Sequence, residues 1–176
     1  MKFIIIGPRS IGKTTVGTLL AKKLKIKYFD FDIFIEKQLK GINNHIEKKG
    51  VESYRLAEGE KVKEFISFLP ESCIISIGGG TIASQFNNLN KQNIKYFKSA
   101  GKFIYLCPSK DKAEAIRILD SREKIRKGGK RLSETTKLFK TRFPIYEKNY
   151  DFKIVIKTKS VKLIVDDILK KLTNNN

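Results

Sequence analysis

The chain has 176 residues, and its hydrophobic content of 40% and charged content of 31% are ordinary for a single soluble globular domain. No apolar run approaches the roughly 20 residues that a membrane-spanning helix needs, and no signal peptide precedes the first predicted strand, so we expect a cytoplasmic protein. The two cysteines, Cys73 and Cys107, form no metal-ligand pattern and are expected to be small buried side chains.

The net charge of +19 is unusual and has two interpretations. It is typical of a nucleic-acid-binding protein, but also of a lysine-rich protein that handles anionic small molecules. The lysines are scattered along predicted helix faces, and most tyrosines and phenylalanines lie in apolar runs that favour a core position. We therefore favour a small-molecule protein and expect no nucleic-acid partner.

The first predicted strand, Phe3 to Ile6, leads into residues 7–14, which read GPRSIGKT. This matches the phosphate-loop pattern G-x-x-x-x-G-K-[ST], and residues 15–25 after it are predicted to be helical. Two glycines let the backbone curl around a phosphate, and the helix adds the positive end of its dipole. Lys13 can reach the β- and γ-phosphates, and the Thr14 hydroxyl can bind Mg²⁺. We predict that ATP binds to Gly7, Ser10, Ile11, Gly12, Lys13, Thr14 and Thr15.

A second short strand, Ile26 to Phe29, is followed by Asp30 and Asp32. Ligands of open α/β sheets bind outside the carboxyl ends of the strands. In an extended chain the two carboxylates would share a face, so one could manage Mg²⁺ while the other holds or deprotonates a hydroxyl. The alternative is that an aspartate caps the helix predicted from Ile33 to Leu39, and one of the two can do so.

The next segment, 41–50, is predicted to be a polar connector. It contains the single histidine of the chain, His45, which we expect to be a surface or capping group. A helix predicted from Val51 to Phe68 places Arg55 and Glu58 on one face, where by themselves they could form only a solvated ion pair.

A β-branched run, Cys73 to Ile77, is predicted to be a strand and precedes three glycines. Glycines directly after a strand allow a ligand to approach the backbone closely. Ser76 stands where a nucleotide kinase usually carries an aspartate. A loop and helix are predicted over Thr81 to Ala100, and a further strand over Lys102 to Leu106.

The most basic and least apolar part of the chain is residues 120–131, which follow a helix predicted over Asp111 to Leu119. Gly128 and Gly129 can act as a hinge, so this segment is predicted to be a lid that closes over the triphosphate and brings an arginine to the γ-phosphate. A solvated charged loop is the alternative. The remaining predictions are a helix over Leu132–Tyr150, a strand over Phe152–Ile156 and an amphipathic helix over Val161–Leu172.

Taken in order, the motifs resemble those of the shikimate kinase family. The resemblance extends over residues 3–156 and involves five segments: the phosphate loop, an Asp-x-Asp, an aromatic-Arg-x-x-Glu, a triple glycine after a strand, and an Arg-x-Pro-Leu-Tyr. In this chain they are residues 7–14, 30–32, 52–58, 76–80 and 142–146. The phosphate loop is shared by many kinases, whereas the other four, in this order and spacing, are much more specific.

This resemblance implies a single three-layer α/β/α P-loop kinase domain over residues 1–176, with a five-stranded parallel sheet in the order 2-3-1-4-5. It also implies a substrate-binding helical region at about 31–66 and a mobile lid at about 120–131. The implied reaction transfers the ATP γ-phosphate to the 3-hydroxyl of shikimate, in the chorismate route to aromatic amino acids. We further expect a monomer.

The resemblance also implies roles for individual residues. Asp32 would hold the reacting hydroxyl and act as its base, while Lys13 and a lid arginine would offset charge on the phosphoryl group. Thr14 and Asp30 would lie on the Mg²⁺ side. The residues that would hold shikimate are Asp32, Arg55, Gly79, Gly80 and Arg142, with the two arginines gripping its carboxylate.

The chain departs from the family in its phosphate loop and its lid. Ser10 stands where the family commonly has a second glycine, and Arg9 is a surplus cation with no assigned role. The family's Arg-Pro-Leu-Leu is absent. Counting back from Arg142 favours Arg122 as the lid arginine, with Arg126 and Arg131 as alternatives. The competing functions are a related kinase for gluconate, a nucleoside or a nucleotide, and a basic nucleic-acid-binding protein.

Overall fold

Five parallel strands form the central sheet in the order β2-β3-β1-β4-β5, which confirms the predicted order. The computed structural model describes residues 1–127 and 132–174, and side chains outside 125–135. The continuous β-branched runs form the inner strands, as expected where both faces of a sheet are covered. The strands are β1 (Lys2–Ile6), β2 (Lys27–Asp30), β3 (Cys73–Ser76), β4 (Lys102–Cys107) and β5 (Phe152–Val155).

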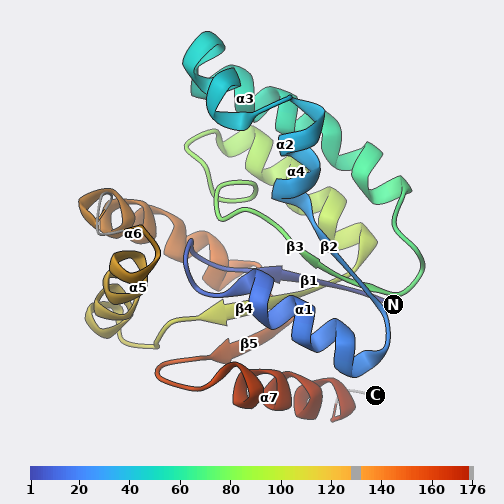
Figure 1. The fold of residues 1–176 in the computed structure, drawn as a ribbon, viewed down its shortest axis with the longest axis vertical. Coiled ribbons are helices and arrows are strands. Elements are labelled where there is room, and N and C mark those ends of the chain that lie inside the picture. Colours follow the sequence, from blue (N-terminus) through green and yellow to red (C-terminus); the bar gives the residue numbers. More distant parts are fainter. Residues whose placement is uncertain (128–131, 175–176) are drawn as a thin grey trace.

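Helices cover both faces of the sheet (Figure 1). They are α1 (Lys13–Leu24), α2 (Phe31–Gln38), α3 (Ile42–Ser67), α4 (Asn87–Ala100), α5 (Lys112–Lys127), α6 (Leu132–Lys148) and α7 (Val161–Thr173). Alternate side chains of β1 enter two different cores. Ile4 and Ile6 pack with α2, α3 and α4, whereas Phe3 and Ile5 pack with α1 and α7. The structure thus has the three layers that the sequence predicted.

All five strands are parallel, so their carboxyl ends meet at one edge of the sheet. The loop between β1 and α1, the end of β2 and the glycines after β3 all lie at this edge. Strand register places Asp30 beside Ser76, and Ser76 beside Ile5. Helices α5 and α6 lie next to the same edge (Figure 1). The sheet therefore brings together the segments that the sequence singled out.

The polar connector predicted over 41–50 is wrong, because α3 already begins at Ile42. Its first turns carry Ile42 and Ile46, which pack against the core that α2, α4 and the rest of α3 share. Gly50 then introduces a kink with φ of 82° and ψ of 167°. Across this kink His45 Nε2 lies 3.1 Å from Ser53 Oγ, so the histidine joins the two halves of the helix.

Helix α5 continues to Lys127, so residues 120–127 are helical and do not form the start of a loop. Intrahelical hydrogen bonds satisfy the backbone of this charged stretch, and Leu119 and Glu123 anchor it in the protein interior. The predicted glycine hinge at 128 and 129 and the C-terminal tail beyond 174 lie outside the described residues. Among the helices that the structure describes, none is long and apolar enough to span a membrane.

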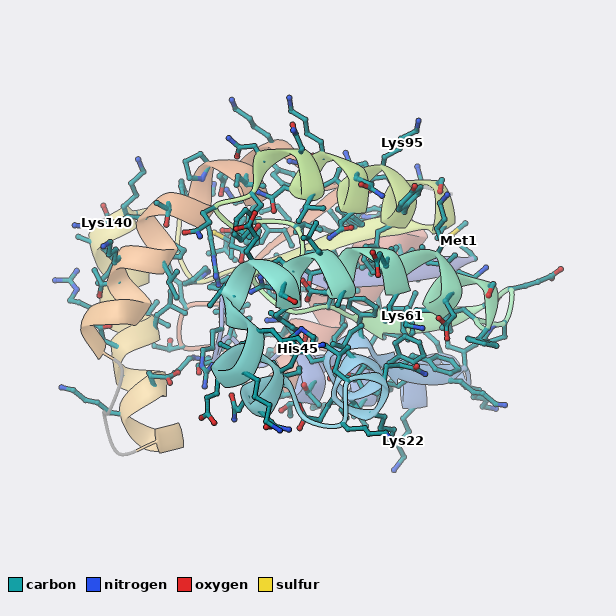
Figure 2. The ribbon with its side chains drawn as sticks, turned by 90° about the horizontal axis from the view of Figure 1, so that it is seen from above. Met1, Lys22, His45, Lys61, Lys95 and Lys140 are labelled. Atoms are coloured by element: carbon teal, nitrogen blue, oxygen red, sulfur yellow. The ribbon has the colours of Figure 1, made fainter. Side chains whose placement is uncertain are left out.

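The two cysteines are buried and not disulfide-bonded, as predicted. The excess lysines are spread over the molecule: Figure 2 labels Lys22, Lys61, Lys95 and Lys140 on four different helices, α1, α3, α4 and α6. This distribution agrees with the interpretation of the charge as dispersed. The absence of a nucleic-acid partner stays a prediction.

Candidate active site

The loop from Gly7 to Gly12 has the backbone shape of an anion cradle. Gly7 and Gly12 have φ of 144° and 98°, and a Cβ on Gly7 would lie 2.8 Å from the carbonyl oxygen of Leu106. Gly12 is the N-cap of α1 and supplies no side-chain cap, so the first amides of the helix can serve a ligand. Lys13 Nζ donates to the carbonyl oxygens of Gly7 (3.1 Å) and Pro8 (3.0 Å), which folds the ammonium over the loop.

Asp30 is both the end of β2 and the cap of α2. Its Oδ1 accepts hydrogen bonds from the amides of Asp32 (3.0 Å) and Ile33 (3.3 Å). The capping interpretation is therefore confirmed for Asp30, and the chain turns into a helix at Phe31. Because Asp32 is already helical, the prediction that the two carboxylates share one face of an extended strand is wrong.

The second oxygen of Asp30 faces the phosphate loop. Asp30 Oδ2 accepts from Thr14 Oγ1 at 3.2 Å, Tyr28 OH at 2.9 Å and Ser76 Oγ at 2.9 Å. Tyr28 OH also lies 2.5 Å from Ser76 Oγ. Burial raises the pKa of Tyr28 to about 12, so it remains a neutral hydroxyl that can orient the carboxylate.

Thr14 and Asp30 together offer hard oxygen ligands at the mouth of the loop, which fits Mg²⁺. Among the described residues there is no group of three or more histidine, cysteine or acidic side chains that could hold a metal ion. Mg²⁺ usually takes only one or two protein oxygens and completes its shell with water and substrate phosphates. A hydroxyl and a carboxylate beside a phosphate loop match that preference.

Asp32 lies between the phosphate loop and α3. The Asp32 side chain is exposed, yet the surrounding protein displaces enough water to raise the pKa of its carboxyl. Asp30 and Glu58 raise this pKa further, whereas Lys13 and, less strongly, Arg55 lower it. A Cβ on Gly78 would collide with Asp32 Oδ1, so only glycine permits this approach. The carboxylate is thus placed against the first glycine of the triplet.

Arg55 and Glu58 form a buried pair and not the solvated pair that the spacing alone allowed. Glu58 is 1% exposed, and its Oε2 accepts from Arg55 Nη1 at 2.6 Å. Its Oε1 accepts from Thr81 Oγ1 (2.9 Å) and Tyr54 OH (3.2 Å). Burial, the largest single influence, would lower the pKa of Arg55, but Glu58, Tyr54 and Asp32 together outweigh it and the pKa is raised. Glu58 therefore holds a charged guanidinium in one orientation.

Arg55 and Arg142 reach the triple glycine from two different helices. A Cβ on Gly80 would collide with the Arg55 guanidinium, and one on Gly79 would lie 3.5 Å from Arg142 Nη1. Tyr146, in α6 one turn after Arg142, donates from its hydroxyl to the Gly79 carbonyl oxygen at 2.6 Å. Burial raises the pKa of Tyr146 to about 12, while Arg142 and Arg55 both act to lower it, so both cations are near its hydroxyl.

Of the three candidate lid arginines, Arg122 is the one whose side chain the structure describes, and it contacts the phosphate loop. Arg122 Nη1 donates to the carbonyl oxygen of Ile11 at 3.0 Å, which places it on the phosphate loop, and burial lowers its pKa. The side chains of Arg126 and Arg131 lie outside the described part of the chain. Of the remaining predicted ATP ligands, Ser10 contacts Glu123 of α5, and Thr15 is exposed in the first turn of α1.

Several residues of the site were not predicted as members of it. Ser76 could have been found from strand register, since β3 neighbours β2, and Tyr146 lies in the segment already singled out by its motif. No local pattern in the sequence indicates that three further residues belong to the site: Tyr28, Thr81 and Glu123. Their partners lie in the interior or in another element.

The sheet order, the phosphate loop and the carboxylate beside it define a P-loop kinase. The sequence model of the family described as shikimate kinase matches residues 9–173. A shikimate kinase of Clostridium botulinum (strain Eklund 17B / Type B) is 31% identical over 99% of this chain and 98% of its own length. The chain belongs to the shikimate kinase family.

Solved structures agree with this assignment. The shikimate kinase of Aquifex aeolicus has a TM-score of 0.73 and 30% identity, covering 99% of this chain and 98% of its own. A shikimate kinase from Acinetobacter baumannii, solved in complex with shikimate, has a TM-score of 0.78 at 24% identity, covering 99% and 94%. The second likeness shows the fold alone.

Proposed function

We propose that this protein transfers the γ-phosphate of ATP to the 3-hydroxyl of shikimate. The observation that carries the proposal is the convergence of Arg55 and Arg142 on the triple glycine, with Asp32 between them and the phosphate loop. Two guanidinium groups from separate helices suit a substrate that carries a planar carboxylate. A carboxylate facing the phosphates suits a hydroxyl acceptor.

In this proposal shikimate lies in the space bounded by Asp32, Arg55, Gly79, Gly80 and Arg142. The arginines bind its carboxylate, and the glycine backbone lets the ring approach closely. Glu58 keeps Arg55 oriented, and Tyr146 holds the Gly79 carbonyl in place. The acceptor hydroxyl then faces Asp32 and the γ-phosphate.

The reaction needs positioning and charge compensation more than covalent help. The 3-hydroxyl oxygen of shikimate forms a bond to the γ-phosphorus as the bond from that phosphorus to the β–γ bridging oxygen breaks. The hydroxyl proton passes to Asp32 and then to solvent, and ADP leaves. Lys13 and Arg122 offset the negative charge on the phosphoryl oxygens. The raised pKa of Asp32 makes it a stronger base than an ordinary aspartate.

Thr14 and Asp30 would hold Mg²⁺, which would supply positive charge to offset the negative charge of the ATP phosphates. The hydrogen bonds from Tyr28 and Ser76 keep Asp30 turned toward the loop. We also propose that the protein acts as a monomer in the cytoplasm, where ATP is available. The large exposed hydrophobic side chains of the described residues are spread over several elements, among them α2, α3 and α7, which supports the monomer.

The test is a coupled assay of ADP release with Mg²⁺ and ATP, in which shikimate, gluconate and a set of nucleosides are offered separately. Of these acceptors, we expect only shikimate to cause ADP release. Release with gluconate or a nucleoside, and none with shikimate, would overturn the proposal. Tight, salt-dependent nucleic-acid binding without acceptor-dependent ADP release would point to the nucleic-acid alternative instead.

Variants of the two arginines locate the carboxylate site. Arg55→Ala and Arg142→Ala should each raise the shikimate KM by about tenfold or more, because each loses charge-assisted hydrogen bonds. Lys61→Ala is the matched control: Lys61 lies on the same helix as Arg55 and pairs with a carboxylate at the same spacing, but both partners are partly exposed. It should leave the KM within about twofold.

A further inference from the structure

Two neighbouring residues of α5 contact three successive residues of the phosphate loop. Arg122 donates to the carbonyl oxygen of Ile11 at 3.0 Å. Glu123 accepts a hydrogen bond from the hydroxyl of Ser10, and its Oε1 lies 3.4 Å from Nε of Arg9. The helix is therefore attached to the outer side of the loop by charged side chains.

Glu123 is buried to an unusual degree for a carboxylate. Its exposed fraction is 0%, and although the Arg9 side chain is 36% exposed, its Nε atom is shielded from solvent. An ionised carboxylate persists in the interior only when it is paired and hydrogen-bonded, and the loss of one partner leaves a costly buried charge. The contact between Arg9, Ser10 and Glu123 thus differs from a surface ion pair, which would contribute little.

The backbone of Ser10 supports the importance of this contact. Its φ is +60°, a left-handed conformation that costs an L-residue free energy and that glycine adopts readily. Glycine at this position would relieve the strain but could not donate to Glu123. The serine hydroxyl offsets the strain of its own backbone by joining the loop to α5.

We propose that Glu123 is a positioning residue that holds Arg122 on the phosphate loop through Arg9 and Ser10. The inference rests on the proposed function, in which Arg122 compensates charge on the transferring phosphoryl group. Glu123 compensates the charge of Arg9 beside the loop, and Arg122 reaches the loop from the preceding position of α5. Glu123 also fixes the segment of helix that carries Arg122, so that the guanidinium is in place before ATP arrives.

A double-mutant cycle on Glu123 and Arg122 tests this coupling. Glu123→Ala should lower kcat/KM for ATP by about 10- to 100-fold, as expected when a group that contacts phosphate is displaced by about an ångström. In the Arg122→Ala background the same change should cost about twofold or less, because the group that Glu123 positions is already gone. An equal loss in both backgrounds would show that Glu123 only supports the fold, and would overturn the inference.

Two further variants separate positioning from folding. Ser10→Gly removes the hydrogen bond to the buried Glu123 but relieves the left-handed strain, so its two effects on stability oppose each other. The melting temperature should fall less than in Glu123→Ala, while kcat/KM for ATP is lowered. Asp120→Asn is the matched control, because Asp120 lies three residues before Glu123 on α5 and contacts Thr136 of α6 instead of the loop. It should leave kcat/KM within about twofold; a loss equal to that of Glu123→Ala would mean that general loosening of α5 is responsible, and would overturn the inference.

The affinity for a nucleotide tests the positioning role of Glu123 independently of shikimate phosphorylation. The four proteins of the cycle can be titrated with Mg²⁺ and a non-hydrolysable ATP analogue, without shikimate. Non-additive losses of affinity would support positioning even if shikimate were not phosphorylated. Additive losses, in a wild-type protein that does phosphorylate shikimate, would overturn the positioning role and leave the proposed function intact.

Discussion

The pair of Arg55 and Glu58 offers the sharpest test of the substrate-side geometry, through Glu58→Gln. In the variant the amide oxygen can still accept from Tyr54 and Thr81, which donate to Oε1 at 3.2 and 2.9 Å. The amide nitrogen, however, would face the donor Nη1 of Arg55, which now lies 2.6 Å from Oε2. The substitution therefore preserves the two hydrogen bonds from neutral hydroxyl donors and replaces the ion pair with Arg55 by two donors that face each other.

The magnitude follows from burial. Breaking a buried ion pair by removing one charge costs about 3–5 kcal/mol. The side chain of Arg55 is 16% exposed and can gain some water, so we expect the lower end, about 3 kcal/mol in the free energy of unfolding. For a chain of this length that corresponds to a fall in melting temperature of about 6–12 °C. The shikimate KM should also rise, because Arg55 loses its fixed orientation.

Urea unfolding of wild type, Glu58→Gln, Arg55→Met and the double variant measures the coupling. Glu58→Gln should cost about 2 kcal/mol less in the Arg55→Met background, because no buried cation is then left unpaired. Additivity within about 0.5 kcal/mol would refute the reasoning. Glu64→Gln, which breaks the partly exposed pair with Lys61 on the same helix, should cost less than about 1 kcal/mol.

Two further predictions concern Asp32 and the glycines. Burial raises the folded pKa of Asp32, so its ionisation costs stability above its unfolded pKa of about 3.9. Asp32→Asn should therefore raise the melting temperature slightly at pH 7 in a thermal-shift assay, and this gain should shrink toward pH 4. A gain that is the same at both pH values would contradict this. Gly80→Ala should displace the Arg55 guanidinium and raise the shikimate KM more than it lowers kcat, and an unchanged KM would contradict the close approach. Gly59 lies inside α3, and a Cβ there would meet its neighbours only at ordinary van der Waals distances. Gly59→Ala should therefore stabilise the protein by about 1 kcal/mol in urea unfolding.

Local patterns accounted for most of the fold and for the phosphate side of the site. Continuous β-branched runs predicted the strands, and the spacing of Gly7, Gly12, Lys13 and Thr14 predicted the loop, because these features depend on residues adjacent in the chain. The order of the strands came from resemblance to a family. The errors arose where local composition misled: residues 42–49 and 120–127 look polar and loop-like, yet they are helical because Ile42, Ile46, Leu119 and Glu123 find partners elsewhere.

Tertiary structure decided what the local patterns left open. The spacing of Arg55 and Glu58 fits a surface pair equally well; only the packing of α3 against the glycine loop removes water and makes the pair rigid. Ser10 and Glu123 are separated by 113 positions in the chain, so no local pattern could connect them. The free energy of a charge depends on which groups displace its water, and that is settled only when distant segments meet.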